Sequence, residues 1–215
     1  MNELFIKKIN PKKEVSFVEA EHLLELKAVS NPINTINWNS FAYVPQVNFR
    51  IAHLNNNILL KFYVIEKAIL AQETQINGSV YKDSCVEFFI SLDGKNYYNF
   101  EFNCIGTIHL AYGSGRKNRK FVSPEIIKNI EIKSTLGNRA FKEKKGSFEW
   151  EMMIRIPIKS FSFDSIKTFN KLKATANLYK CGDDTSDPHY LSWNPIKTEN
   201  PDFHRPEYFG EVLFE

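Results

Sequence analysis

The sequence has no hydrophobic run long enough to span a membrane, and its first ten residues, MNELFIKKIN, contain no apolar segment typical of a secretion signal. It contains only three cysteines, Cys85, Cys104 and Cys181, which are widely spaced and form no CxxC pair. We therefore expect three buried free thiols rather than a disulfide framework.

Common catalytic motifs are also missing. The nearest match to the GxSxG nucleophile motif, YGSGR at 112–116, lacks the required spacing, and we interpret it as a flexible turn. The sequence contains no HExxH zinc motif, no phosphate-binding P-loop and no GxGxxG. Nothing specific therefore predicts an enzyme, and catalysis stays an alternative only through paired carboxylates.

The net charge is small, +3 at pH 7, and the basic residues are dispersed. The clearest basic run, Arg116–Lys120 in GRKNRK, is short, and we interpret it as a solvated loop. Because nucleic-acid binding needs a contiguous basic face, we expect no nucleic-acid partner.

What the sequence does contain is alternation of apolar and polar residues, interrupted by turn signals. A length of 215 residues with 43% hydrophobic content suits one packed domain, and helical patterns are weak beyond 17–29 and a turn at 123–129. We predict an all-β fold, an antiparallel β-sandwich of jelly-roll or immunoglobulin-like topology, in one domain over 1–215 with an N-terminal extension, 1–42, packed on it. The expected strands cover 48–54, 58–66, 84–92, 97–112, 129–136, 146–157, 173–183 and 210–215.

Strand alternation predicts which side chains share a face. Glu87 falls on the opposite side of its strand from the apolar residues, and Glu101 and Asn103 do the same on the next strand. Together they predict a face lined by carboxylates and an amide, or a solvent-facing side of the sheet. Trp150 alternates with apolar residues, so we expect it in the core.

The stretch HYLSWNPIKTENPDFHRPEYFG, residues 189–210, combines rings and polar groups with prolines. Trp193, Phe203, His204 and Arg205 could all face one pocket there. Sugars expose apolar C–H faces that stack on aromatic rings, and hydroxyls that bond to planar polar groups. The alternatives are that Trp193 anchors the loop in the sandwich and that His204 and Arg205 form an internal hydrogen-bond network.

Five blocks in order, VYKDSCVEFFI, YYNFEFNCIGT, ANLYKCGD, PHYLSWNPI and PDFHRPEYFGEVLF, resemble the carbohydrate-binding module family nine-like proteins of Bacteroidetes, within a superfamily that includes DOMON domains. The resemblance runs from about Tyr43 to the C-terminus. It implies a β-sandwich that binds a glycan between two tryptophans, of which Trp193 matches one. Tyr81 stands where the other is expected, and Glu87 matches the glutamate of that strand.

The resemblance also implies structural calcium, but its ligands cannot be carried over to this sequence. We interpret Asp183, Asp184 and Asp187 as turn-forming residues. We therefore predict no cofactor and no metal-ligating residue, with structural calcium left open by the resemblance.

The sequence thus predicts a non-catalytic carbohydrate-binding protein whose partner is an oligosaccharide or polysaccharide, in a monomer or weak dimer. The alternatives are a glycan hydrolase using Glu87 and Glu101, or a protein-interaction module. Arg50 is expected either to pair with Glu66 or Glu87, or to join the site. The compartment stays open, since free thiols favour the cytoplasm and the resemblance favours the periplasm or cell surface. The predicted ligand-binding residues are Trp193, Tyr81, Glu87, Asn103, Glu101, His204, Arg205 and Arg50.

Overall fold

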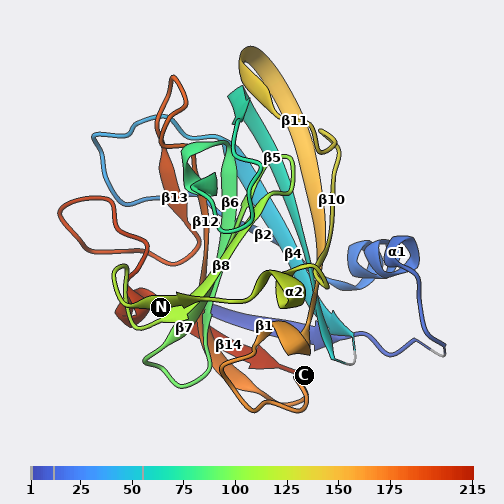
Figure 1. Cartoon of the computed structure of the whole chain (residues 1–215). Coiled ribbons are helices and arrows are strands. Elements are labelled where there is room, and N and C mark those ends of the chain that lie inside the picture. Colours follow the sequence, from blue (N-terminus) through green and yellow to red (C-terminus); the bar gives the residue numbers. More distant parts are fainter. Residues whose placement is uncertain (1, 12, 55) are drawn as a thin grey trace.

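Two β-sheets pack face to face in this protein, whose computed structural model describes residues 2–11, 13–54 and 56–215 (Figure 1). The predicted antiparallel β-sandwich is confirmed. Sheet A has the strand order β14-β12-β6-β7-β8-β9, with β13 and β3 beside the far end of β12. Sheet B has the order β10-β11-β5-β4, with β2 at its edge.

The strands of sheet A are β3 (Thr35–Ile36), β6 (Cys85–Ser91), β7 (Tyr97–Asn103), β8 (Ile108–Gly113), β9 (Arg119–Phe121), β12 (Lys173–Cys181), β13 (Tyr190–Ser192) and β14 (Gly210–Phe214). Those of sheet B are β2 (Ser30–Pro32), β4 (Gln46–Leu54), β5 (Asn57–Ala71), β10 (Glu131–Ser134) and β11 (Phe141–Pro157). The helical segments are α1 (Phe17–Lys27), α2 (Pro124–Ile127), η1 (Val80–Lys82), η2 (Ile158–Ser160) and η3 (Pro206–Tyr208).

Strand β1 (Glu3–Lys8) connects the two sheets at one edge of the sandwich. Its residues 3–6 pair with β14, and Lys7 and Lys8 pair with β4, in both cases in parallel. The sequence did not predict this strand, which lies within the 1–42 extension. The extension therefore contributes one strand, β1, that is shared by both sheets.

The core between the sheets follows from the alternation within the strands. Val86, Phe88 and Ile90 of β6 point inward with exposed fractions of 0%. Trp150 of β11, facing them from sheet B, is 1% exposed, so its predicted core position is confirmed. The prediction of three buried free thiols is confirmed as well.

Helix α1 covers the outer face of sheet B (Figure 1). Ser16 and Glu19 form a reciprocal capping box at its start, which explains why the predicted helix begins at residue 17. Arg50 lies on this outer face because Phe49 and Ile51, its neighbours in β4, point into the core. It pairs with Glu25 of α1 at 3.2 Å, so the expected pairing with Glu66 or Glu87 is wrong.

One predicted strand, 97–112, is divided in the structure. The chain turns between β7 and β8, and Gly106 adopts a φ of +85° there, which glycine accommodates without steric cost. Asn55, between the expected strands 48–54 and 58–66, lies outside the described residues, and β4 and β5 pair antiparallel on either side of it. No helix in the described part of the chain is long and apolar enough to cross a membrane.

A buried ion pair joins the two sheets. The Lys180 ammonium of β12 lies 2.9 Å from Glu66 Oε2 of β5, and both side chains are 0% exposed. The Trp150 indole N–H donates to Glu66 Oε1 at 2.7 Å. Lys180 Nζ also donates to His189 Nε2 at 2.8 Å, and His189 Nδ1 donates to the Asp187 carbonyl at 2.8 Å. Both nitrogens of His189 are therefore assigned, and the ring is neutral.

Replacing Glu66 with Gln should lower the free energy of unfolding by about 3–5 kcal/mol, because it leaves the Lys180 ammonium buried without its counter-charge. Urea titration measures the change. The double variant Glu66→Gln/Lys180→Met should recover most of the loss, since it removes the buried charge itself. A decrease of less than about 1 kcal/mol in the free energy of unfolding of the single variant would show that the ion pair contributes little to stability.

Stability should also fall in mild acid because of His189. Burial, followed by the Lys180 charge, lowers the pKa of His189 well below its ordinary 6.5. Below about pH 6.5 this histidine becomes protonated in the unfolded chain but stays neutral in the folded chain. The free energy of unfolding therefore decreases as the pH falls through about 6.5. Lowering the pH from about 7.5 to about 5.5 should reduce the free energy of unfolding by about 1 kcal/mol through His189. Urea titrations at both pH values should show a smaller loss in His189→Gln, and equal losses in the two proteins would contradict the assignment.

Candidate functional site

A cavity of about 470 Å³ lies on the outer face of sheet A. Its floor is a row of side chains, because the strand register pairs Glu87 with Glu101 and Glu101 with His109. The predicted common face of the two glutamates is confirmed. Each glutamate is only 3% exposed, so this polar face is enclosed rather than open to solvent.

Loops lie over this face (Figure 1), and residues of the C-terminal loop line the cavity. The ring of Phe203, which lines the cavity, stacks on Tyr179 with centroids 4.1 Å apart and planes at 9°. The Tyr179 hydroxyl donates to the Phe203 carbonyl at 3.1 Å. Trp38 packs against Phe203, and its indole N–H donates to the Thr198 carbonyl at 2.9 Å. These contacts fix the C-terminal loop over the sheet.

His204 follows Phe203 in the same loop and also lines the cavity. Its Nδ1 lies 2.8 Å from the Tyr97 hydroxyl, and its ring lies against Phe89 at 5.1 Å. Burial, followed by the charge of Arg119, lowers the pKa of His204 to about 2. A neutral imidazole therefore faces the cavity at physiological pH.

The environment of Glu87 favours the neutral form of its carboxyl group. Burial raises its pKa well above the ordinary value, and the neighbouring groups Cys181 and Glu101 raise it further. The Cys181 thiol donates to Glu87 Oε1 at 3.1 Å. A protonated carboxyl can both donate and accept a hydrogen bond, so Glu87 offers either function to a bound molecule.

Glu101 is held on the cavity floor by polar neighbours. Asn99 Nδ2 donates to its Oε1 at 2.7 Å, and Arg119 Nη1 lies 3.7 Å from the same oxygen. Two buried nitrogens beside it, Arg119 Nη1 and His109 Nε2, have no hydrogen-bond partner among the described residues. Arg119 and His109 both line the cavity, so the unpaired nitrogens belong to residues that a ligand or water in the cavity would contact.

Two tyrosines, Tyr81 and Tyr190, stand beside these polar groups. Both are partly buried, and Tyr190 packs edge-on against Phe41 with centroids 4.7 Å apart. Asp183 lies with them in the lining. Burial raises the pKa of Asp183 to about 6, although a hydrogen bond with Tyr190 opposes the shift.

Four of the eight predicted binding residues line the cavity, and four do not. Tyr81, Glu87, Glu101 and His204 lie together in it. Residues that the sequence did not select include His109, Arg119 and Asp183, which come from strand or loop positions without a distinctive motif. Arg116 and Arg119 also reach the cavity, although we interpreted their basic run only as a solvated loop.

Trp193 lies outside this cavity, within the hydrophobic core. Its indole is 7% exposed and packs edge-on against Phe49, with centroids 6.4 Å apart. The ring lies so close to Gly210 that an added Cβ there would meet it at 2.5 Å. The expected common pocket with Phe203, His204 and Arg205 is therefore wrong for Trp193, and the alternative of a loop anchor agrees with its position.

The other three predicted residues have structural or solvent contacts. Asn103 Nδ2 donates to Asp83 Oδ2 and to the Glu73 carbonyl, each at 2.8 Å. Arg205 pairs with Glu207 at 2.6 Å at the surface, outside the cavity lining. Arg50 belongs to the opposite sheet, as described above.

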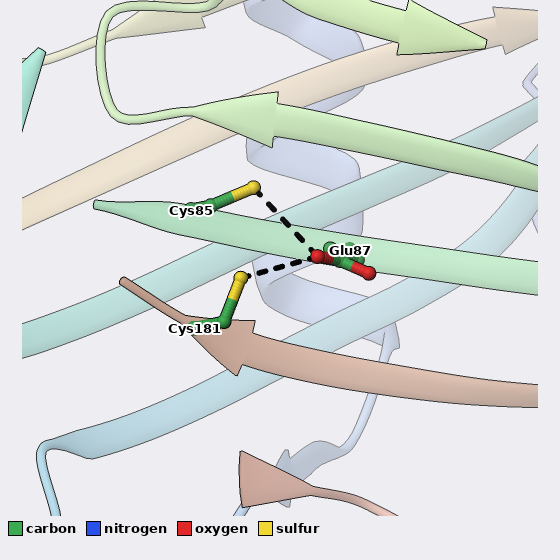
Figure 2. A group of neighbouring side chains, drawn as sticks. All are labelled: Cys85, Glu87 and Cys181. Atoms are coloured by element: carbon green, nitrogen blue, oxygen red, sulfur yellow. Dashed lines mark hydrogen bonds between the residues drawn. The ribbon is translucent and has the colours of Figure 1, made fainter. Parts of the chain in front are cut away.

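Two thiols and a carboxylate cluster at the cavity floor. Figure 2 shows Cys85 and Cys181 directed at the carboxylate of Glu87. Cys85 and Cys181 are direct partners across β6 and β12, and Glu87 is on the same face of β6 as Cys85. The ligand atoms of all three lie within 4.8 Å of one another.

Calcium prefers a larger set of oxygen ligands than this cluster offers. Searching the described residues for close groups of His, Cys, Asp and Glu gives the Cys85, Glu87 and Cys181 cluster. Asp184 instead pairs with Lys82 at 3.2 Å, and Asp183 with Tyr190. Among the described residues no such group of carboxylates matches the calcium implied by the family resemblance, which stays an expectation.

Comparisons with known proteins agree with this fold. A protein from Bacteroides uniformis, provisionally described as carbohydrate-binding, shares 36% sequence identity, with 99% of each chain covered and a TM-score of 0.95. A family 9 carbohydrate-binding module from Caldicellulosiruptor kristjanssonii, solved with cellotriose, shares 12% identity and a TM-score of 0.63, with 100% of this chain and 94% of that chain covered. A family 9 module from the same organism, solved with glucose, shares 14% identity and a TM-score of 0.59, with 100% of this chain and 96% of that chain covered.

At these low identities the two Caldicellulosiruptor structures show a shared fold alone. A search of curated proteins gives no match. The model of the family described as carbohydrate-binding family 9 matches residues 18–214, which is most of the chain. This protein therefore belongs to carbohydrate-binding family 9.

Proposed function

We propose that this protein binds an oligosaccharide or polysaccharide in the cavity of sheet A without turning it over. In this proposal Tyr81 and Tyr190 stack on a sugar ring, while Glu87, Glu101 and His204 bond to its hydroxyls. A volume of about 470 Å³ lies within the usual range of small-molecule pockets.

The observation that carries the proposal is a pair of unsatisfied nitrogens on two residues that line the cavity. Arg119 Nη1 and His109 Nε2 are buried without a hydrogen-bond partner among the described residues, and they belong to β9 and β8, next to Glu101 of β7. An unpaired buried polar group costs about 1–3 kcal/mol, so a ligand that supplies its missing partner gains that energy. Sugar hydroxyls both donate and accept, which suits this mixture of donors and carboxyl groups.

The surrounding wall supports the same proposal. Phe203 and His204 are held by stacking on Tyr179 and Phe89 and by the hydrogen bond to Tyr97. A loop that is ordered before binding loses little conformational entropy when the ligand enters. Cellotriose and glucose, which the related modules bind, are the first ligands to test on this chain.

Changing Glu101 to Gln should weaken saccharide binding at least about 10-fold, because it removes a buried charged acceptor beside Arg119. Titration calorimetry with glucose, cellotriose and a panel of soluble oligosaccharides measures the effect. Glu131→Gln is the matched control, since Glu131 pairs with Arg155 at 3.0 Å on sheet B, away from the cavity. It should bind as the unchanged protein does.

Three results would overturn this proposal. Equal affinities for the unchanged protein and Glu101→Gln would exclude the cavity as the binding site. New reducing ends in the same mixtures would show hydrolysis, with Glu87 as the protonated carboxyl and Glu101 as the second group of an acid–base pair. The absence of binding across the whole panel would remove the carbohydrate-binding proposal for these sugars.

Changing Tyr81 to Ala should weaken binding about 10-fold through loss of ring stacking, whereas Tyr81→Trp should retain or increase affinity. Phe163→Ala is the matched control, because this partly exposed ring stacks on Tyr112 at 5.0 Å outside the cavity lining. The core residue Trp193 provides a second contrast, and Trp193→Phe should lower stability with little change in affinity. A large loss of affinity in Trp193→Phe with intact folding would instead favour Trp193 as the stacking ring.

A further inference from the structure

The cluster of Cys85, Cys181 and Glu87 has the atoms and spacing of a metal site. Cys181 Sγ lies 3.1 Å from Glu87 Oε1, Cys85 Sγ lies 4.0 Å from the same oxygen, and all three ligand atoms are within 4.8 Å of one another. The three side chains converge from two adjacent strands (Figure 2). Their positions are set by strand register rather than by a flexible loop.

The two sulfur–oxygen separations are close to those around tetrahedral zinc. Bond lengths of about 2.3 Å to sulfur and about 2.1 Å to oxygen place two sulfurs about 3.8 Å apart, and sulfur and oxygen about 3.6 Å apart. The observed sulfur–oxygen separations, 3.1 and 4.0 Å, lie on either side of that value. Shifts of a few tenths of an ångström would bring both to it.

The ligand types select the metal. Thiolates favour soft or borderline ions such as Zn²⁺ and Co²⁺, whereas Ca²⁺ and Mg²⁺ require oxygen ligands. We propose that Cys85, Cys181 and Glu87 bind a thiophilic divalent cation, Zn²⁺ in the resting protein. The inference does not depend on the proposed sugar binding, because the metal alone tests it.

The fourth coordination position would face the cavity. Glu87 and Cys181 both line the cavity, whereas the neighbouring strands close the other side of the cluster. Three protein ligands with one open position is the arrangement of zinc sites that hold water or a ligand oxygen. A cation here would thus present itself to any molecule in the cavity.

Titration of the reduced full chain with Co²⁺ tests the inference. We expect one equivalent to produce thiolate–cobalt charge-transfer absorption and the strong visible bands of tetrahedral cobalt, and Zn²⁺ to abolish both. Cys181→Ser and Glu87→Gln should each weaken Co²⁺ binding at least about 100-fold. Cys104→Ser is the matched control, because Cys104 is buried but donates to the Leu70 carbonyl, outside the cluster. It should keep the spectrum unchanged.

A second measurement needs no substitution in the cluster. One equivalent of Zn²⁺ should raise the thermal unfolding midpoint of the unchanged protein, while Ca²⁺ should not. The inference is overturned if Co²⁺ gives no tetrahedral spectrum, or if the spectrum survives in folded Cys181→Ser. It is also overturned if non-denaturing mass spectrometry shows a Cys85–Cys181 disulfide in place of bound metal. A protein that binds Co²⁺ but no saccharide would keep this inference and reject the proposed function.

Discussion

The buried ion pair between Lys180 and Glu66 fixes how strand β12 sits in the sandwich. Its charged atoms are 2.9 Å apart, with both side chains fully enclosed, so Lys180 must point between the sheets. Side chains alternate along a strand, and Tyr179 and Cys181 must therefore point to the outer face. These two residues carry the stacked ring of the cavity wall and the thiol beside Glu87. A single polar contact in the core thus orients two elements of the candidate site.

The sequence predicts the sheets well where alternation is strong. Phe88 of β6 and Phe100 of β7 are buried between the sheets. Because successive side chains in a strand point to opposite faces, their neighbours Glu87 and Glu101 must point to the outer face. It failed at Gly106, where a positive φ ends one apolar run and begins another strand. It also failed at β1, whose parallel pairing with two strands distant in sequence has no local signal.

Prediction of the candidate site was limited by the loops. Composition indicates that 189–210 carries rings, but a loop has no periodicity to show which rings face inward. Trp193 enters the core because Gly210 leaves room for its indole, and that fit depends on a tertiary contact. Arg119 shows the opposite error, because we expected its basic run to be solvated, whereas its side chain lies beside Glu101 on the cavity floor. In both cases the deciding contact is a tertiary one that no local periodicity in the sequence indicates.

Glu87 links the two proposals for this cavity through its charge. Without a metal, burial favours the protonated form of its carboxyl, and that form can donate a hydrogen bond to a sugar oxygen. With a cation bound, the same carboxyl must be ionised and directed at the metal, so that donor is lost. The cation would then supply the positive group that faces the cavity. Metal occupancy would therefore change which sugar hydroxyls the site can recognise, and affinities measured on metal-free and zinc-loaded protein would describe two different sites.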